Sequence, residues 1–218
     1  MRDEDFSLFI EEFGEANSGE AVPDSAFGKW EGRLPNQLLI YWRQEGWCGY
    51  AQGLFWTVNP DEYEDLVGEW LADTPLEQMD AFHVFGRSAF GDLYLCGERS
   101  GANATVCCSI NAITAVPKEL QAKDEGRRDS SIRSFFAASF RADFDRSDLS
   151  KKPLFARARS QSGALAVDEI YGFEPALILG GKPVLENLRK VKLDQHLTML
   201  RQFGVPKVPF GSLDIDRL

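Results

Sequence analysis

Few residues in this 218-residue chain have the types and spacing that chemistry requires. A nucleophile–base pair needs a histidine, or an equivalent base, held beside a serine, threonine or cysteine. The sequence has two histidines: His83 alternates with Phe82 and Val84 in a strand pattern, and His196 lies in an amphipathic helical pattern. These positions indicate structural or surface histidines, so neither predicts a catalytic base.

Two other motifs resemble functional sites. Asp168-Glu169 could act as a carboxylate pair, but adjacent side chains point to different sides of a strand or turn. Gly180-Gly181-Lys182 resembles a phosphate-binding loop, yet the upstream glycine of G-x-x-x-x-G-K-[ST] is missing and Pro183 stands where Ser or Thr belongs. We therefore predict a turn at 180–182 and a chain that is not an enzyme. An enzyme that uses Asp168, Glu169 and a histidine is the weakest alternative.

Cysteine usage and the start of the chain predict a cytoplasmic protein without a cofactor. Cys48, Cys96, Cys107 and Cys108 show no C-x-x-C spacing and no histidine at ligand spacing, which predicts reduced, mostly buried thiols and no metal. The acidic N-terminus does not have the features of a signal peptide. No apolar run approaches the roughly 20 residues that span a bilayer, so we expect no membrane association.

The net charge of −10 is unevenly distributed. Residues 1–75 hold 16 acidic and 4 basic side chains, a net of −12, whereas residues 76–218 hold 18 acidic and 20 basic, a net of +2. This asymmetry argues against direct binding of nucleic acid or an anionic membrane by the first third. It favours a basic protein partner attracted by electrostatic steering, and the alternative is a solvated acidic surface.

The segment 59–71 predicts the best helix of the chain. Asn59 suits the N-cap, and Pro60 suits the first helical position. This helix has more acidic residues on its exposed side than capping requires. We expect these residues to bind the partner: Asp61, Glu62, Glu64, Asp65 and Glu69. Three acids in or just after an earlier helix are secondary candidates for the same role: Glu11, Glu12 and Glu15.

An aromatic cluster lies in the same acidic third, with Trp42, Trp47 and Trp56 among its members. Stacking on bases would need a basic surround, so core packing is the better interpretation. One or two of these side chains could serve as interface anchors, where Trp and Tyr are favoured.

Periodicity predicts an α+β fold in which an antiparallel sheet meander packs with helices as two closely associated subdomains, 1–75 and 76–218. The expected helices cover 6–13, 34–44, 59–71, 131–140, 151–160 and 194–203. The expected strands cover 47–50, 54–58, 83–87, 92–97, 105–110, 113–116 and 164–167. Segments 17–28 and 117–130 read as loops, Ser131 and Asp194 as helix caps, and the tail after Gly204 as extended.

Specific strings carry a family resemblance. LPNQLLIYWRQEGWCGYAQGLFWTVNPDEYEDLVGEWL (34–71) resembles the GAD-like domain. FHVFGRSAFGDLYLCGERSG (82–101), DEIYGFEPALILGG (168–181) and KVKLDQHLTMLRQFG (190–204) resemble the C-terminal domain that follows it in Tdi-type immunity proteins of type VI secretion systems.

The resemblance implies an immunity protein that binds and neutralises a cognate secreted toxin, typically a DNase, by occluding its basic surface or active site or by binding elsewhere on it. No catalytic residues carry over from the family. A different class remains open, a small-ligand or peptide-binding regulatory module with an aromatic pocket near Trp42 and Trp56.

Overall fold

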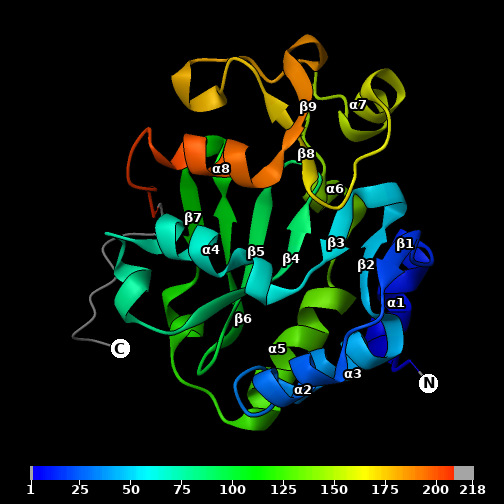
Figure 1. Cartoon of the computed structure of the whole chain (residues 1–218), viewed down its shortest axis with the longest axis vertical. Coiled ribbons are helices and arrows are strands. Elements are labelled where there is room, and N and C mark those ends of the chain that lie inside the picture. Colours follow the sequence, from blue (N-terminus) through cyan, green and yellow to red (C-terminus); the bar gives the residue numbers. More distant parts are fainter. Residues whose placement is uncertain (1, 209–218) are drawn as a thin grey trace.

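A seven-stranded antiparallel sheet forms the centre of the molecule, with its strands in chain order from β1 to β7 (Figure 1). The computed structural model describes residues 2–208. The strands are β1 (Ser18–Glu20), β2 (Trp47–Tyr50), β3 (Phe55–Thr57), β4 (Phe82–Ser88), β5 (Asp92–Gly97), β6 (Gly101–Cys107) and β7 (Ala112–Ala115). Strands adjacent in sequence pair directly because most of their connections are short. The α+β fold with an antiparallel meander is confirmed.

Helices cover both faces of the sheet and create two hydrophobic cores. The helices are α1 (Glu4–Phe13), α2 (Asp24–Trp30), α3 (Asn36–Glu45), α4 (Glu64–Leu71), α5 (Glu125–Ala137), α6 (Arg141–Phe144), α7 (Phe155–Ser162) and α8 (Leu193–Arg201). The first core lies under α1, α3 and α5, and the second lies under α4 and α8. Successive strand residues alternate between them, so Phe85 and Tyr94 enter the first core while Val84 and Leu93 enter the second.

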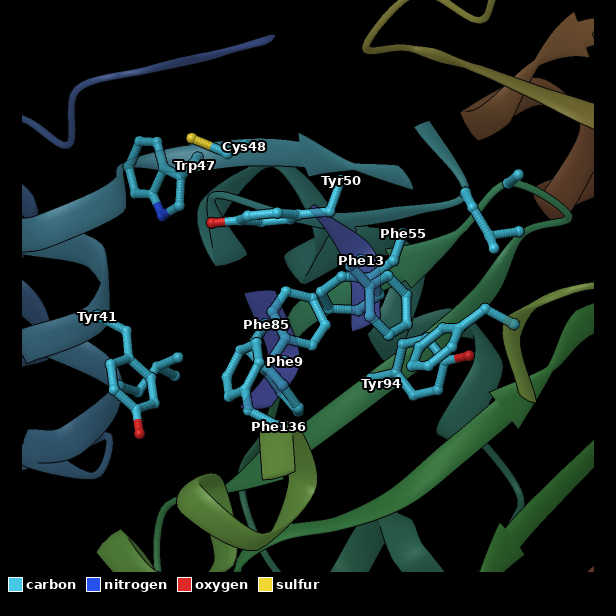
Figure 2. Packing of buried hydrophobic residues seen from close by; sticks show 14 of the residues in the cluster. Phe9, Phe13, Tyr41, Trp47, Cys48, Tyr50, Phe55, Phe85, Tyr94 and Phe136 are labelled. Atoms are coloured by element: carbon cyan, nitrogen blue, oxygen red, sulfur yellow. The ribbon is translucent and has the colours of Figure 1, made fainter. Parts of the chain in front are cut away.

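Phenylalanine supplies much of the first core. Phe9 of α1 stacks on Phe13 with ring centroids 4.3 Å apart, and it meets the edge of Phe136 of α5 at 5.1 Å. Figure 2 shows these rings gathered against Phe55 of the sheet. Such aromatic pairs add about 0.5–1.5 kcal/mol beyond the burial of their area. The i, i+3, i+7 spacing of the α1 phenylalanines therefore places this helix on the sheet.

A two-stranded sheet of β8 (Glu169–Phe173) and β9 (Leu188–Lys192) lies with α7 at one end of the molecule (Figure 1). The Tyr171 amide donates to the Ala89 carbonyl at 2.9 Å, which joins this small sheet to the turn after β4. The boundary expected between residues 75 and 76 falls between β3 and β4, which are paired neighbours in the large sheet.

Several predicted elements match the structure. The helices at 6–13 and 34–44, the hairpin of 47–50 with 54–58, and the meander strands at 83–87, 92–97 and 113–116 are all confirmed. The turn at 180–182 is confirmed as well, because Gly180 has φ 85° and the Gly181 amide donates to the Ala176 carbonyl. All four cysteines are free thiols, and only Cys107 is partly exposed.

The loop predicted at 17–28 is wrong. This segment contains β1, whose residues are all exposed, and the start of α2, which follows Pro23. A three-residue exposed strand has no apolar alternation, so the sequence carries no period that would reveal it.

The cap predicted at Ser131 is also wrong. α5 begins at Glu125, where Asp124 Oδ1 accepts a hydrogen bond from the Arg127 amide at 2.9 Å. The polar first two turns of α5 concealed its start, because they present few apolar positions. Ser131 instead accepts a hydrogen bond from the Ala102 amide of β6.

The remaining differences concern element ends and two strands. No strand forms at 164–167; β8 begins at Glu169, and β9 was missed because its LRKVK sequence is mostly charged. The helix expected at 151–160 is α7, at 155–162, and the strand expected at 105–110 is β6, which ends at Cys107. α8 starts at Leu193, so Asp194 lies in its first turn and is not its cap. Of the extended tail, residues 209–218 lie outside the described part of the chain.

Candidate functional site

The candidate partner surface is the exposed side of the segment from η2 (Pro60–Tyr63) through α4, here called the α4 acidic face. Its members are Asp61, Glu62, Glu64, Asp65 and Glu69. Asn59 Oδ1 accepts a hydrogen bond from the Asp61 amide at 3.2 Å, and Pro60 occupies the first helical position. The predicted single helix is therefore a 3₁₀ turn followed by an α-helix.

Burial on the opposite side fixes which residues are exposed. Tyr63, Leu66, Val67 and Trp70 enter the second core, and Trp70 is fully buried. The five acidic side chains are all exposed. The structure thus brings the five predicted residues together on one surface. The negative charge of Glu64 and Asp65, in the first turn of α4, is favoured by the helix dipole.

Lys29 of α2 neutralises part of this surface. Its Nζ lies 2.6 Å from Asp61 Oδ1 and 3.4 Å from Glu64 Oε1. The hydrogen bond to Asp61, with smaller contributions from the two charges, raises the pKa of Lys29. Among residues 2–208, Glu62, Asp65 and Glu69 form no ion pair, so the uncompensated charge is carried by these three.

Arg201 of α8 fixes the C-terminal end of α4. Its Nε donates to the Glu69 carbonyl at 2.8 Å, and its Nη2 donates to the Ala72 carbonyl at 2.9 Å. A cation at the carbonyl end of a helix is favoured by the helix dipole and satisfies carbonyls that have no partner within the helix. Sequence reasoning missed Arg201, because a contact across 132 residues leaves no local signal.

The secondary candidates do not join this surface. Glu11 and Glu12 lie on α1, and Glu15 follows its end. α1 packs on the first core, whereas α4 packs on the second, so the two helices occupy opposite faces of the sheet (Figure 1). Glu12 Oε1 accepts a hydrogen bond from the Arg141 amide at 3.1 Å. Glu15 pairs with Arg2 at 2.6 Å, which lowers the pKa of Glu15, and Glu11 is exposed.

The aromatic pair considered for a ligand pocket is also divided. Trp42 packs in the first core against Trp47, with centroids 5.8 Å apart, while Trp56 belongs to the second core. Trp56 and Trp47 both line a cavity of about 410 Å³, and Trp42 lines a different one beside β1. Within the described residues, Trp42 and Trp56 therefore line two different cavities and not one common pocket.

The groups considered for catalysis are engaged in structural contacts. His83 Nε2 lies 3.0 Å from Glu98 Oε1, and its ring packs on the edge of Trp30. His196 is buried, which lowers its pKa. Asp168 and Glu169 face lysines of β9, with Asp168 Oδ2 at 2.6 Å from Lys192 Nζ.

Two further observations concern metals and membranes. Within the described residues, no group of three or more His, Cys, Asp or Glu side chains is arranged to hold a metal ion. In the same part of the chain, no helix combines the length and apolar composition needed to cross a bilayer.

Comparison with known proteins identifies two family segments. Residues 4–110 match the GAD-like domain, and residues 129–204 match the C-terminal domain of the T6SS immunity protein Tdi1. The string at 82–101 thus belongs to the first domain, so its expected assignment to the second domain is wrong. No curated protein matches.

One solved structure gives independent support for the fold. The crystal structure of Atu4351 from Agrobacterium tumefaciens superposes with a TM-score of 0.79 at 23% sequence identity. The match covers 91% of this chain and 89% of the other. At that identity the likeness concerns the fold alone.

Proposed function

Because this chain, with its GAD-like domain followed by the Tdi1 C-terminal domain, belongs to the Tdi-type immunity proteins of type VI secretion, we propose that it binds and neutralises a cognate DNase toxin. The Tdi1 C-terminal domain supports the immunity role itself. The DNase chemistry and the mode of binding are the parts that we add.

The α4 acidic face is the observation that supports a DNase partner. A DNA-cleaving domain presents lysines and arginines to phosphates, so a surface of opposite sign is attracted to it. Glu62, Asp65 and Glu69 offer carboxylates that no cation among the described residues neutralises. Trp70, buried in the second core, and Arg201, bonded to the C-terminal end of α4, fix the segment that carries them. The surface is thus ordered before the partner arrives, which lowers the entropic cost of binding.

In this proposal the charges and the buried contacts have separate roles. The carboxylates raise the association rate and exclude DNA from the basic surface of the toxin, since like charges repel. Affinity comes mainly from a few desolvated anchors, because charges at the rim of an interface add little alone. The chain acts in the cytoplasm without catalysis of its own and does not bind nucleic acid directly.

Co-expression tests this function. Cells that carry the toxin encoded by the adjacent gene should survive only when this chain is also expressed, and the two proteins should copurify. Degradation of plasmid DNA in cells without the chain would identify the toxin as a DNase. Continued killing without a copurifying complex would reject the immunity function. If the chain protects, but unprotected cells die without degradation of their DNA, only the DNase assignment is rejected.

A further inference from the structure

A second feature, formed mainly by the GAD-like domain, is a cavity of about 410 Å³, here called the Trp56 cavity. It lies beside β1, β3, β4 and η2, and its wall includes Trp47, Trp56, Tyr63, Arg87 and Val167. Its volume is within the range of small-molecule sites, which are commonly about 300–1,000 Å³ and lined by aromatic residues with a few polar groups. The α4 acidic face adjoins it, because Glu62 belongs to both.

Arg87 is the unusual group in this wall. It is fully buried, although a charge is buried only at a high cost unless it is paired. Its Nη2 donates to the Val167 carbonyl at 2.7 Å, and its Nη1 lies 3.4 Å from the Ser88 carbonyl. Its Nε has no partner among the described residues. The Tyr63 hydroxyl is a further side-chain hydrogen-bond partner. A guanidinium has five N–H donors, so Nε and part of the Nη donors are left for another acceptor.

No carboxylate of the chain forms an ion pair with Arg87 among residues 2–208. Asp168 is the acid that acts on it through charge, but Asp168 is paired with Lys192 at 2.6 Å. Glu20 and Glu62 line the cavity and are exposed to solvent. Burial lowers the pKa of Arg87, as expected for a guanidinium without a buried counter-ion.

The surroundings of Arg87 favour a flat ligand. Trp56 lies under the guanidinium, with the Cζ atom 4.9 Å from the ring centroid, and Trp47 supplies a second aromatic surface to the cavity. We propose that the Trp56 cavity binds a small organic oxyanion, a carboxylate or phosphate ester with a planar apolar body, whose oxygens accept hydrogen bonds from Arg87.

Binding has a structural consequence for Val167. Arg87 is enclosed, so the oxyanion takes over the guanidinium donors now held by the Val167 carbonyl. Residues 163–168 form no helix or strand, and Val167 is 68% exposed, so its carbonyl can turn away from Arg87. The Gly163 carbonyl, bonded to the Tyr171 hydroxyl, and the Asp168 carbonyl, bonded to the Leu193 amide, hold the two ends of this segment in place. Exchange of a neutral carbonyl for a charged oxygen is favourable, because it gives the buried guanidinium the counter-ion that it lacks. Val167 lies in the Tdi1-type segment, so the ligand would also contact both domains.

Tryptophan fluorescence of the whole chain tests the proposal, since Trp47 and Trp56 line the cavity. The probes are benzoate and phenyl phosphate, with neutral benzamide as the matched control at equal ionic strength. We expect saturable quenching by at least one of the two anions and none by benzamide. The stronger anion identifies the ligand as a carboxylate or a phosphate ester. Saturation by neither anion, or equal binding of benzamide, would overturn the proposal.

Two variants locate the site. Arg87→Lys and Arg87→Met should weaken the binding anion at least tenfold, whereas Arg189→Met, which removes an arginine bonded only to nearby carbonyls, should leave it unchanged. Unaltered binding by a folded Arg87 variant would contradict the assignment. If neither variant folds, a crystal of the unaltered chain soaked with the 4-bromo derivative of the binding probe decides: bromine must lie in the Trp56 cavity, and bromine elsewhere rejects it.

Discussion

Arg201 Nε lies 2.8 Å from the carbonyl oxygen of Glu69, so the closing helix of the second domain holds the end of the acidic helix of the first. The same guanidinium reaches the Ala72 carbonyl and, through Nη1, the Gly204 carbonyl at 3.0 Å. One side chain therefore ties the α4 acidic face to the second domain, and the position of the proposed partner surface depends on both domains.

Removal of this contact should destabilise the chain. Arg201→Met leaves the Glu69 and Ala72 carbonyls without their charged donor, and hydrogen bonds to charged groups contribute about 1.5–3 kcal/mol each at most. We expect a loss of about 1–3 kcal/mol in the free energy of unfolding, measured by urea denaturation. Arg189→Met, which breaks only local contacts, is the control. An unchanged urea midpoint for Arg201→Met would show that the contact does not stabilise the fold.

Charge reversal should show whether the α4 acidic face is the docking surface. Asp65→Lys with Glu69→Lys reverses two uncompensated charges of the α4 acidic face, and we expect slower association with the toxin and a weaker dependence on salt. The matched control is Glu31→Lys with Glu186→Lys, two exposed acids outside that face. Stopped-flow association rates distinguish the pairs. Equal slowing by both would mean that net charge alone matters, and no slowing by the first would remove α4 as the docking face.

Lys29 should reduce the net negative charge of the α4 acidic face. Lys29→Met frees the Asp61 and Glu64 carboxylates, so association at low salt should become faster. Both partners are exposed, and stability should change little. The measurement is the rate constant at 20 and 200 mM salt, where the gain should be present at the lower concentration and largely screened at the higher. A slower rate at low salt would contradict this role.

The first core should respond strongly to loss of one ring. Phe9 is fully buried among Phe13, Phe55 and Phe136, so Phe9→Ala should cost about 3–5 kcal/mol. Leu8 on the same helix is 46% exposed, and Leu8→Ala is the matched control with an expected effect below about 1 kcal/mol. Thermal or urea unfolding compares the two variants. Similar losses for both would contradict the assigned packing of α1.

Acidification should weaken the fold through His196. Burial, opposed by the charge of Glu174, lowers the pKa of His196 in the folded state, so the unfolded chain binds a proton more readily. This contribution is fully present above the unfolded pKa of about 6.5 and is lost as the pH falls through it towards the folded pKa. The fall in unfolding free energy between pH 7.5 and 5.5 should be smaller in His196→Gln. Identical slopes for the variant and the unaltered chain would exclude this contribution.

Sequence alone predicts the elements whose burial follows a simple period. Phe6, Phe9 and Phe13 repeat on one side of a helix, and the alternating residues of β4 and β5 fill two cores, so both patterns are visible locally. The acidic face is also predictable, since Tyr63, Leu66 and Trp70 must be buried and leave the acids outside.

The missed features depend on contacts between distant segments. β1 is visible only through its pairing with β2, and β9 only through its pairing with β8. Lys29 meets Asp61 across 32 residues, and Arg87 meets Val167 across 80. Periodicity describes which side of an element is buried, but it does not tell which other element covers that side, so these relationships require the fold.

Inhibition in a purified system tests the central claim most directly. The toxin of the adjacent gene is mixed with this chain, and the rate of DNA cleavage is measured as the ratio of chain to toxin increases. The account predicts that cleavage stops at one chain per toxin molecule, and that Asp65→Lys with Glu69→Lys shifts inhibition to higher ratios or longer preincubation. Undiminished cleavage at an excess of the unaltered chain would contradict it.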